Sequence, residues 1–226
     1  MHRAGTVMLL ALLGAAALGD AATDIPQAVV VLEEVVQGRA GQVPEAAPPR
    51  FVLLEDGQVF VGGTSRLAAG RLSSAEVKAL DRRLAEIRKL PGLAGTVRLG
   101  GGEGRQRLLL RRGRPLDMTV IGDPSQAAPA LRPLATLIDD LARFDHPSLR
   151  PYEPGAYAVS AREGALAGGC RKWPFKESPA ESVFAPRTLT GDSLHDWPAG
   201  ASPASVCVGG KTYVVTFRPL LPGERP

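Results

Sequence analysis

The chain has 226 residues and a formal net charge of +4, and 44% of its residues are hydrophobic, which is typical of a globular protein. After residue 22, no stretch is long and apolar enough to cross a membrane as a helix, which excludes a multi-span membrane protein. Only two cysteines are present, too few for a four-ligand zinc site without two nearby histidines.

The first residues show the three parts of a secretory signal peptide. His2 and Arg3 form a short, weakly positive start, residues 6–18 form an uncharged apolar run, and small residues surround Asp20. The run is shorter than the roughly 20 residues that span a bilayer, and no nearby cysteine offers a lipid anchor. We therefore predict a signal peptide at residues 1–22, cleaved between Gly19 and Thr23. The mature chain is expected to be soluble, in the periplasm or outside the cell.

The two cysteines, Cys170 and Cys207, are predicted to form a structural disulfide, because an even number of cysteines in an exported chain favours pairing. A redox-active pair usually needs the close C-x-x-C spacing, which is absent. The bond would close a loop of nearly 40 residues and contribute about 3–4 kcal/mol in the chain-entropy model.

The first elements are predicted from local patterns. Residues 28–36 are rich in β-branched side chains and indicate a strand. Residues 50–63 read as a β-hairpin around a two-residue type I′ turn at Asp56-Gly57. This turn would set Leu54 opposite Val59 and Val52 opposite Val61, and these four side chains would form one buried face.

A helix is predicted after this hairpin. Ser73 and Glu76 form the pattern of a capping box. An apolar stripe with three- and four-residue steps follows, and Pro91-Gly92 marks its end; the stripe consists of Val77, Leu80, Leu84 and Ile87. The stripe is expected to pack on a sheet.

The same order, hairpin then helix, is predicted a second time. A second hairpin spans residues 107–121 with its turn at Arg112-Gly113. Asp123-Pro124 opens a second helix, made irregular at its start by Pro129 and Pro133. The glycine run at residues 100–104 lacks the G-K-[ST] ending of a phosphate loop and leads into no helix, so it is interpreted as a connection.

Residues from 147 onward have a different character, with more proline and glycine and most of the aromatic residues. Strands are predicted at residues 157–162 and 211–218, the second after a Gly209-Gly210 turn. They either extend the first sheet or form a small sheet of their own. The predicted fold is therefore α+β. Residues 23–146 would form an antiparallel sheet with both helices on one face, and residues 147–226 an irregular, disulfide-tied region of the same or a second domain.

Two groups of residues are candidates for binding. Arg111, Arg112 and Arg114 belong to a strongly basic stretch that could meet an anionic polymer, the alternative being a solvated face. Nucleic acid is not expected, because no aromatic residue lies between Phe60 and Phe144 to stack on bases. Trp173 and Trp197 could make protein or carbohydrate contacts if exposed, the alternative being that both pack under the disulfide loop.

No catalytic, metal-binding or cofactor-binding residue is predicted. His195-Asp196, with Ser193 and Ser205 nearby, is the most suggestive group, but a triad needs its carboxylate to orient the imidazole from elsewhere in the chain. No G-x-S-x-G elbow is present. His146, His195, Asp192 and Asp196 lack the spacing of a metal site.

Several short motifs, taken together, resemble a group of exported bacterial proteins of unknown function. They are the F-x-L-L-x-D-G-x-V hairpin at residues 51–59, Trp173-Pro174, Cys207 and the ending R-P-L-L-P-G-E at residues 218–224. The resemblance implies a location in the cell envelope and implies no reaction or ligand. The sequence therefore predicts an exported, non-enzymatic binding or structural accessory, whose partner could be another envelope protein. The alternatives are a secreted hydrolase and an enzyme inhibitor that presents the Arg112-Gly113 turn.

Overall fold

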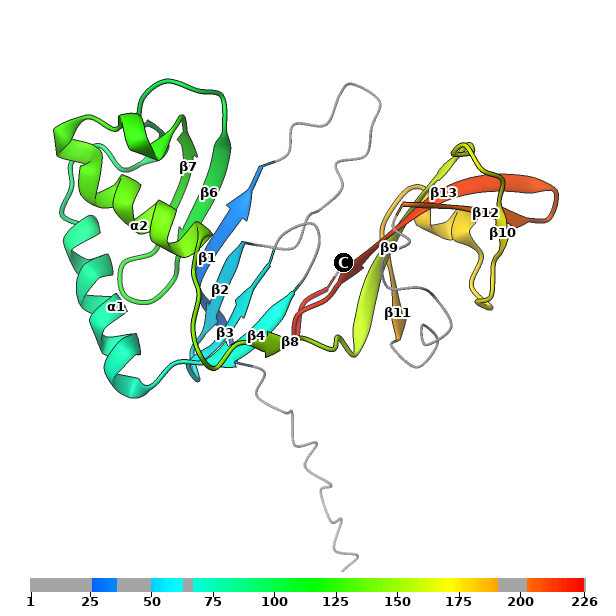
Figure 1. Ribbon diagram of the computed structural model, residues 1–226, viewed down its shortest axis with the longest axis horizontal. Coiled ribbons are helices and arrows are strands. Elements are labelled where there is room, and N and C mark those ends of the chain that lie inside the picture. The colour runs from blue at the N-terminus through cyan, green and yellow to red at the C-terminus, as the bar shows by residue number, and fades with distance from the viewer. Residues whose placement is uncertain (1–25, 36–49, 63–66, 191–202, 226) are drawn as a thin grey trace, which may run out of the picture.

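The computed structural model describes residues 26–35, 50–62, 67–190 and 203–225. Within these ranges the chain forms two β-sheets and two α-helices, which confirms the α+β class (Figure 1). The predicted signal peptide, Ser193, His195 and Trp197 lie outside the described residues.

The first sheet has eight strands in the described residues. Their spatial order is β5 (Gly95–Arg98), β7 (Leu116–Ile121), β6 (Arg105–Leu110), β1 (Ala28–Glu34), β2 (Phe51–Leu54), β3 (Gln58–Val61), β4 (Ala68–Arg71) and β8 (Arg150–Pro151). All neighbours are antiparallel except β5, which pairs with β7 in parallel. The expected sheet was purely antiparallel, so the parallel edge strand is a correction. The sheet also extends past residue 146, through β8.

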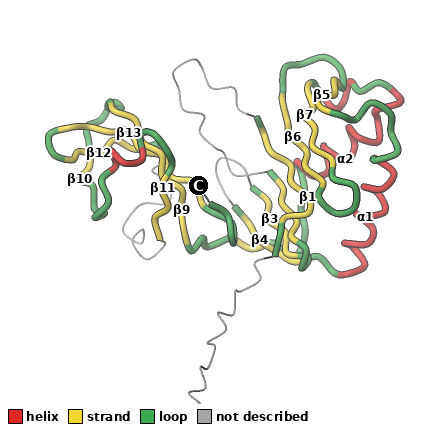
Figure 2. The backbone as a smooth tube through the Cα atoms, turned by 180° about the vertical axis from the view of Figure 1, so that it is seen from behind, coloured by secondary structure: helices red, strands yellow, loops and turns green. Residues whose placement is uncertain are grey.

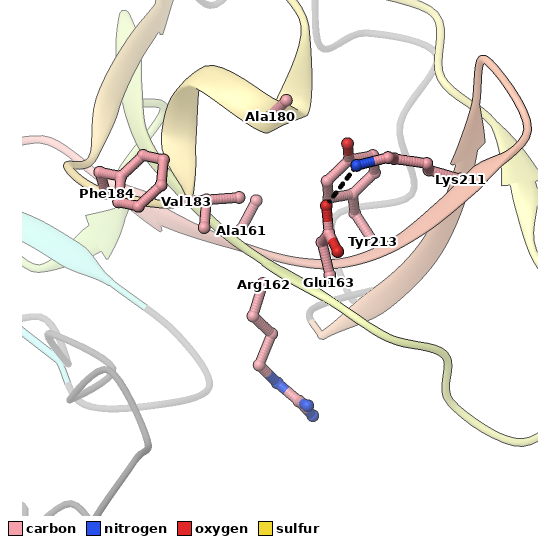
Figure 3. A pocket seen from close by; sticks show the side chains of 8 residues that line it. All are labelled: Ala161, Arg162, Glu163, Ala180, Val183, Phe184, Lys211 and Tyr213. Atoms are coloured by element: carbon pink, nitrogen blue, oxygen red, sulfur yellow. Dashed lines mark hydrogen bonds and ion pairs between the residues drawn. The ribbon is translucent and has the colours of Figure 1, made fainter.

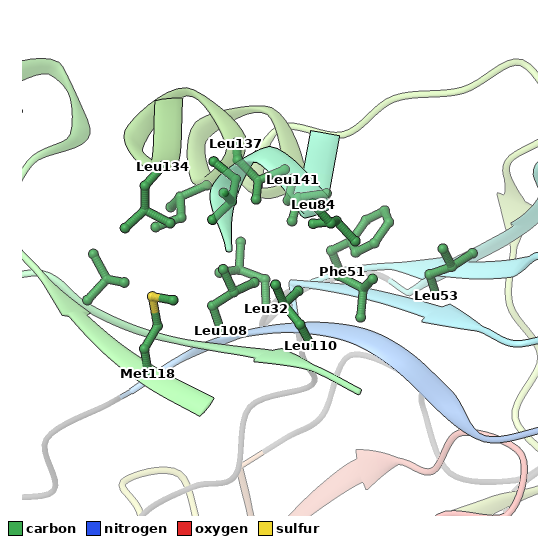
Figure 4. Close-up of a cluster of buried hydrophobic side chains, with 14 of the residues drawn as sticks. Leu32, Phe51, Leu53, Leu84, Leu108, Leu110, Met118, Leu134, Leu137 and Leu141 are labelled. Carbon is green, nitrogen blue, oxygen red and sulfur yellow. The ribbon is translucent and has the colours of Figure 1, made fainter. Parts of the chain in front are cut away.

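Both helices, α1 (Ser74–Ile87) and α2 (Arg132–Ala142), cover one face of this sheet, as predicted (Figures 1 and 2). The core between the layers is entirely apolar, and Figure 4 shows leucines of both helices above strand residues. Its fully buried members include Leu32, Phe51, Leu53, Leu84, Leu108, Leu110, Met118, Leu134, Leu137 and Ile138.

The helix starts follow the sequence signals. Ser73 caps α1: its hydroxyl oxygen accepts from the Glu76 N–H, and its own backbone N–H donates to the Glu76 carboxylate, which completes the capping box. Asp123 caps only a short 3₁₀ turn, η1 (Pro124–Gln126), and a second one, η2 (Pro129–Leu131), precedes α2. Pro129 and Pro133 explain why the α-helix begins only at Arg132, because proline lacks the N–H that a continuing helix needs.

The first hairpin has a different register from the predicted one. Leu53, not Leu54, lies opposite Val59. Since β2 ends at Leu54 and β3 begins at Gln58, the loop has three residues, 55–57. Of these three, only Gly57 has a positive φ, of 84°. A type I′ turn needs a positive φ at Asp56 as well. The one-residue shift moves Val59 to the helix-facing side with Phe51 and Leu53. Val52, Leu54 and Phe60 form the opposite, outer face.

The second hairpin is also wider at its tip than expected. Leu110 lies opposite Leu116, which leaves residues 111–115 as the connection in place of a two-residue turn. Proline at position 115 cannot donate to a strand ladder, which explains why the pairing stops before the tip.

The second sheet has five strands in the described residues, so the C-terminal strands form a sheet of their own. Its order is β10 (Arg171–Lys172), β12 (Ala204–Val208), β13 (Lys211–Pro219), β9 (Ala156–Glu163) and β11 (Arg187–Thr190). Gly209 and Gly210, both with positive φ, form the two-residue turn between β12 and β13, as predicted. Trp173, Phe175 and Val183, with the 3₁₀ turn η3 (Pro179–Ser182), contribute to the core on one face.

The predicted disulfide between Cys170 and Cys207 is present, with a Cα–Cα distance of 5.6 Å. It fastens the start of the edge strand β10 to its neighbour β12. The long connection between β9 and β11 is therefore covalently tied to the sheet that it covers.

Candidate functional site

Trp173 is a core residue. Its side chain is only 8% exposed, its indole N–H donates to the Glu177 carbonyl over 2.6 Å, and its ring contacts Phe175 and Phe217. This corrects the hypothesis of an exposed Trp173 and agrees with the alternative, in which it packs within the disulfide-tied region. Trp197 and its surroundings lie outside the described residues.

The arginine-rich hairpin tip is fastened to α1. Arg112 forms an ion pair with Asp81 at 2.7 Å, and the Arg88 guanidinium donates to the carbonyls of Arg112 and Arg114. The backbone N–H of Arg111 donates to the Val29 carbonyl. The base of this tip is therefore held against the helix, while Arg111, Gly113 and Arg114 remain exposed.

Other cations of this stretch are paired as well. Arg83 contacts Asp140 at 2.6 Å, and Arg107 contacts Asp117 at 2.7 Å. The hydrogen bond with Arg107 lowers the pKa of the Asp117 carboxyl, and the same contact raises the pKa of Arg107. The side chains of Arg111 and Arg114 are exposed. The surface thus carries both signs, which favours the solvated-face interpretation over a site for an anionic polymer.

The glycine run packs closely against another loop. A Cβ on Gly100 would lie 2.4 Å from the Gln126 carbonyl oxygen, and one on Gly122 would lie 2.7 Å from the Gly100 oxygen. The Asp123 N–H also donates to the Gly101 carbonyl over 2.6 Å. The glycines are therefore required for backbone contact, which agrees with their interpretation as a connection.

The structure brings together one group of polar residues that the sequence did not reveal. His146 Nε2 lies 3.0 Å from Glu76 Oε1, and His146 Nδ1 lies 2.7 Å from Ser148 Oγ. Hydrogen bonds from the Ser73 hydroxyl and N–H, together with the contact with His146, lower the pKa of Glu76 to about 2. Glu76 and His146 are 70 positions apart in sequence, so no local spacing could have indicated this contact.

The chain of contacts from Ser148 through His146 to Glu76 has the residue types of a hydrolase catalytic triad. However, the Ser148 hydroxyl is already bound to the backbone of Arg71. Its hydroxyl oxygen accepts from the Arg71 N–H over 3.0 Å and lies 3.1 Å from the Arg71 carbonyl oxygen. The Ser148 N–H donates to His146 Nδ1 over 3.2 Å. The group therefore connects β4, the start of α1 and the segment before β8, and we assign it a structural role.

A candidate binding site among the described residues is a shallow pocket of about 510 Å³ on the second sheet (Figure 3). Its apolar lining comes from β9, β13 and the segment around η3: Ala161, Ala180, Val183, Phe184 and Tyr213. An ion pair between Lys211 and Glu163, 2.8 Å long, lies at the other end of the pocket from Phe184.

Phe184 is the unusual member of this pocket. Its side chain is 96% exposed, although phenylalanine is among the residues most often buried in proteins. Among the described residues, the only other exposed large hydrophobic side chain is Val35, at 37%. The sequence offered no signal for Phe184, because an aromatic residue in an irregular segment is compatible with either core or surface.

No family model matches the chain, and no curated protein or solved structure has detectable similarity to it. In the described ranges, no helix is long and apolar enough to span a bilayer. The same ranges contain no group of three or more histidine, cysteine, aspartate or glutamate residues arranged to hold a metal ion.

Proposed function

We propose that this chain is an exported, non-catalytic accessory of the bacterial cell envelope that acts by binding another macromolecule. The observation that carries the location is the Cys170–Cys207 disulfide, because structural disulfides form and persist in oxidising compartments. The N-terminal pattern of a positive start, an apolar run and small residues supports the same location.

The binding role is supported by the shape of the Phe184 pocket. It is shallow and open, and its most exposed side chain is a large aromatic, the kind of residue that dominates protein–protein contacts. A small-molecule substrate is usually held in a deeper site that buries most of its surface. The pocket therefore fits a macromolecular surface better than a small substrate.

The location is tested by producing the full chain in a Gram-negative host and analysing each cell fraction by mass spectrometry. We expect the protein outside the cytosol, with its first residue between Asp20 and Thr23 and with both cysteines inaccessible to maleimide until a reductant is added. A variant with Leu9→Arg and Leu10→Arg interrupts the apolar run and should stay in the cytosol with Met1. Wild-type protein found there with Met1 intact and both thiols free would contradict the proposal.

A further inference from the structure

The disulfide of the second sheet lies on the face opposite the aromatic core. Val206 belongs to that core together with Trp173. Successive side chains of a strand point to opposite faces, so Cys207 points away from the core and the bond to Cys170 lies on the other face. Cys170 is exposed and Cys207 is half-buried. Exposed disulfides are the ones that exchange readily with thiols, whereas buried structural ones resist reduction.

The segment that carries Cys170 is open to an approaching molecule. It leads into β10, which has two residues, lies at the edge of the sheet and pairs with β12 (Figure 1). Gly168 and Gly169 precede it with positive φ, and a Cβ on either would meet no described atom within 4 Å apart from the neighbouring residues. Access helps to decide which sulfur a thiolate attacks, so Cys170 is the sulfur that an external thiol reaches.

Three side chains form a row across β10, β12 and β13 on this face. Lys172 and Thr212 are the register partners of Cys207 on its two sides, and partners in register point to the same face. The Thr212 hydroxyl donates to Cys207 Sγ over 3.7 Å, since a disulfide sulfur carries no proton. A cation and a hydrogen-bond donor stabilise negative charge on sulfur. The row therefore makes Cys207 the favoured leaving group when Cys170 is attacked.

We propose that the Cys170–Cys207 bond is a thiol-exchange site that is reduced by a protein dithiol. A thiolate of the partner attacks Cys170 Sγ, the disulfide bond breaks, and its electron pair passes to Cys207 Sγ. The partner's second thiolate then attacks the partner's own sulfur in this mixed disulfide and releases Cys170 as a thiolate. Two electrons and two protons thus pass to this chain, and the partner becomes a disulfide.

A dithiol fits this geometry better than a single thiol. Cys207 stays near Cys170, because their Cα atoms are 5.6 Å apart and β12 is held by β13. It would therefore expel a single thiol from Cys170 and re-form the bond, whereas a second thiol on the partner completes the reduction. This chain has no C-x-x-C pair, so it is the substrate of the exchange. The reaction goes beyond the proposed binding role, and its failure would leave the proposed export and binding untouched.

The first test is the reduction of the native, oxidised protein by thioredoxin, a protein dithiol, without denaturant. We expect a rate that rises in proportion to the thioredoxin concentration. A thioredoxin variant that lacks its second cysteine should be trapped on Cys170, as located by peptide mapping. A rate that is independent of thioredoxin and equal to the rate of unfolding, or trapping on Cys207, would overturn the proposal. Reduction by dithiothreitol where thioredoxin does not react would contradict a protein partner.

The second test concerns Lys172 and uses dithiothreitol, so that charge attraction between two proteins plays no part. Lys172→Gln should slow reduction about three- to tenfold, because the leaving sulfur loses its cation, whereas Lys172→Arg keeps the charge and should react like the wild type. Arg171→Gln is the matched control, since Arg171 is also exposed but points to the opposite face of β10. Equal rates for wild type and Lys172→Gln, or equal slowing by both glutamine variants, would overturn the role of Lys172.

Discussion

Glu76 illustrates how one side chain joins two distant segments of this protein, the start of α1 and the segment after α2. Its carboxylate accepts from the hydroxyl and N–H of Ser73, at 2.6 and 2.7 Å, and contacts His146 Nε2 at 3.0 Å. The capping box was predictable, because its two members are three residues apart in sequence. The histidine contact was not, because it depends on where the chain returns after α2.

The pH dependence of the protein's stability should show the contribution of the Glu76 carboxylate. Its pKa falls from 4.5 in the unfolded chain to about 2 in the folded one, so its contribution is complete above pH 4.5 and is lost as the pH falls through about 2. We expect Glu76→Gln to melt at a lower temperature than the wild type at pH 7, with the difference vanishing near pH 2. Thermal melts across this range test it, with Glu86→Gln, an exposed residue of the same helix, as the control. A constant difference at all pH values would contradict the assignment.

Gly100 allows a test of backbone packing at a single atom. A Cβ at this position would lie 2.4 Å from the Gln126 carbonyl oxygen, and backbone can move only if the loop opens. We therefore expect Gly100→Ala to destabilise the fold by about 1–3 kcal/mol, measured by urea denaturation. Gly155→Ala is the matched control, because nothing lies within 4 Å of its Cβ position, and it should be neutral. Equal effects of the two substitutions would rule out the close contact as the cause.

At the level of elements, the sequence predicted which segments pair but not how they are aligned. Phe51, Val52, Leu53 and Leu54 are all buried, so apolar side chains face both sides of β2 and alternation carries no information about register. The Asp-Gly pair is compatible with two- and three-residue loops. In the structure, Asp56 Oδ1 accepts from the Gln58 N–H over 3.0 Å, which fixes the longer loop.

The disulfide should stabilise the second sheet in particular. It closes a loop with a sequence separation of 37 around the connection that carries Trp173, and its loss should cost about 3–4 kcal/mol. We expect Cys170→Ser/Cys207→Ser to lower the free energy of unfolding by this amount, with blue-shifted tryptophan emission lost at lower denaturant concentration. The wild type measured with and without reductant gives the same comparison without mutation. Coincident unfolding curves would show that the bond contributes nothing.

At the level of the whole molecule, the C-terminal segment, residues 220–224 after β13, connects the two sheets. Leu221 is buried in one apolar cluster with Val52, Leu54 and Phe60 on the outer face of the first sheet. The Tyr152 hydroxyl donates to the Leu220 carbonyl over 3.1 Å. Nothing in the local sequence indicates this contact, because it joins the last strand to the first sheet. The two helices alone therefore do not complete the burial of that sheet.

The segment is also shaped by its own polar residues. The Glu224 carboxylate accepts from Arg218 at 2.6 Å and from the Leu221 N–H at 3.0 Å. These bonds turn the chain so that Leu221 faces the sheet. The R-P-L-L-P-G-E ending, noticed in the sequence only as a motif, thus has a structural explanation in its arginine, its second leucine and its glutamate.

Removing the Leu221 side chain should therefore weaken the whole fold and not only the chain end. The residue is 9% exposed in an apolar cluster, and Leu221→Ala is expected to cost about 2–3 kcal/mol, measured by urea denaturation. A truncation after Glu224 is the matched control, because it removes only residues beyond the contacts described, and it should unfold like the full chain. If Leu221→Ala and this truncation behave alike, the segment does not hold the two sheets together. If only the alanine variant is destabilised, burial of the outer face depends on the C-terminal segment.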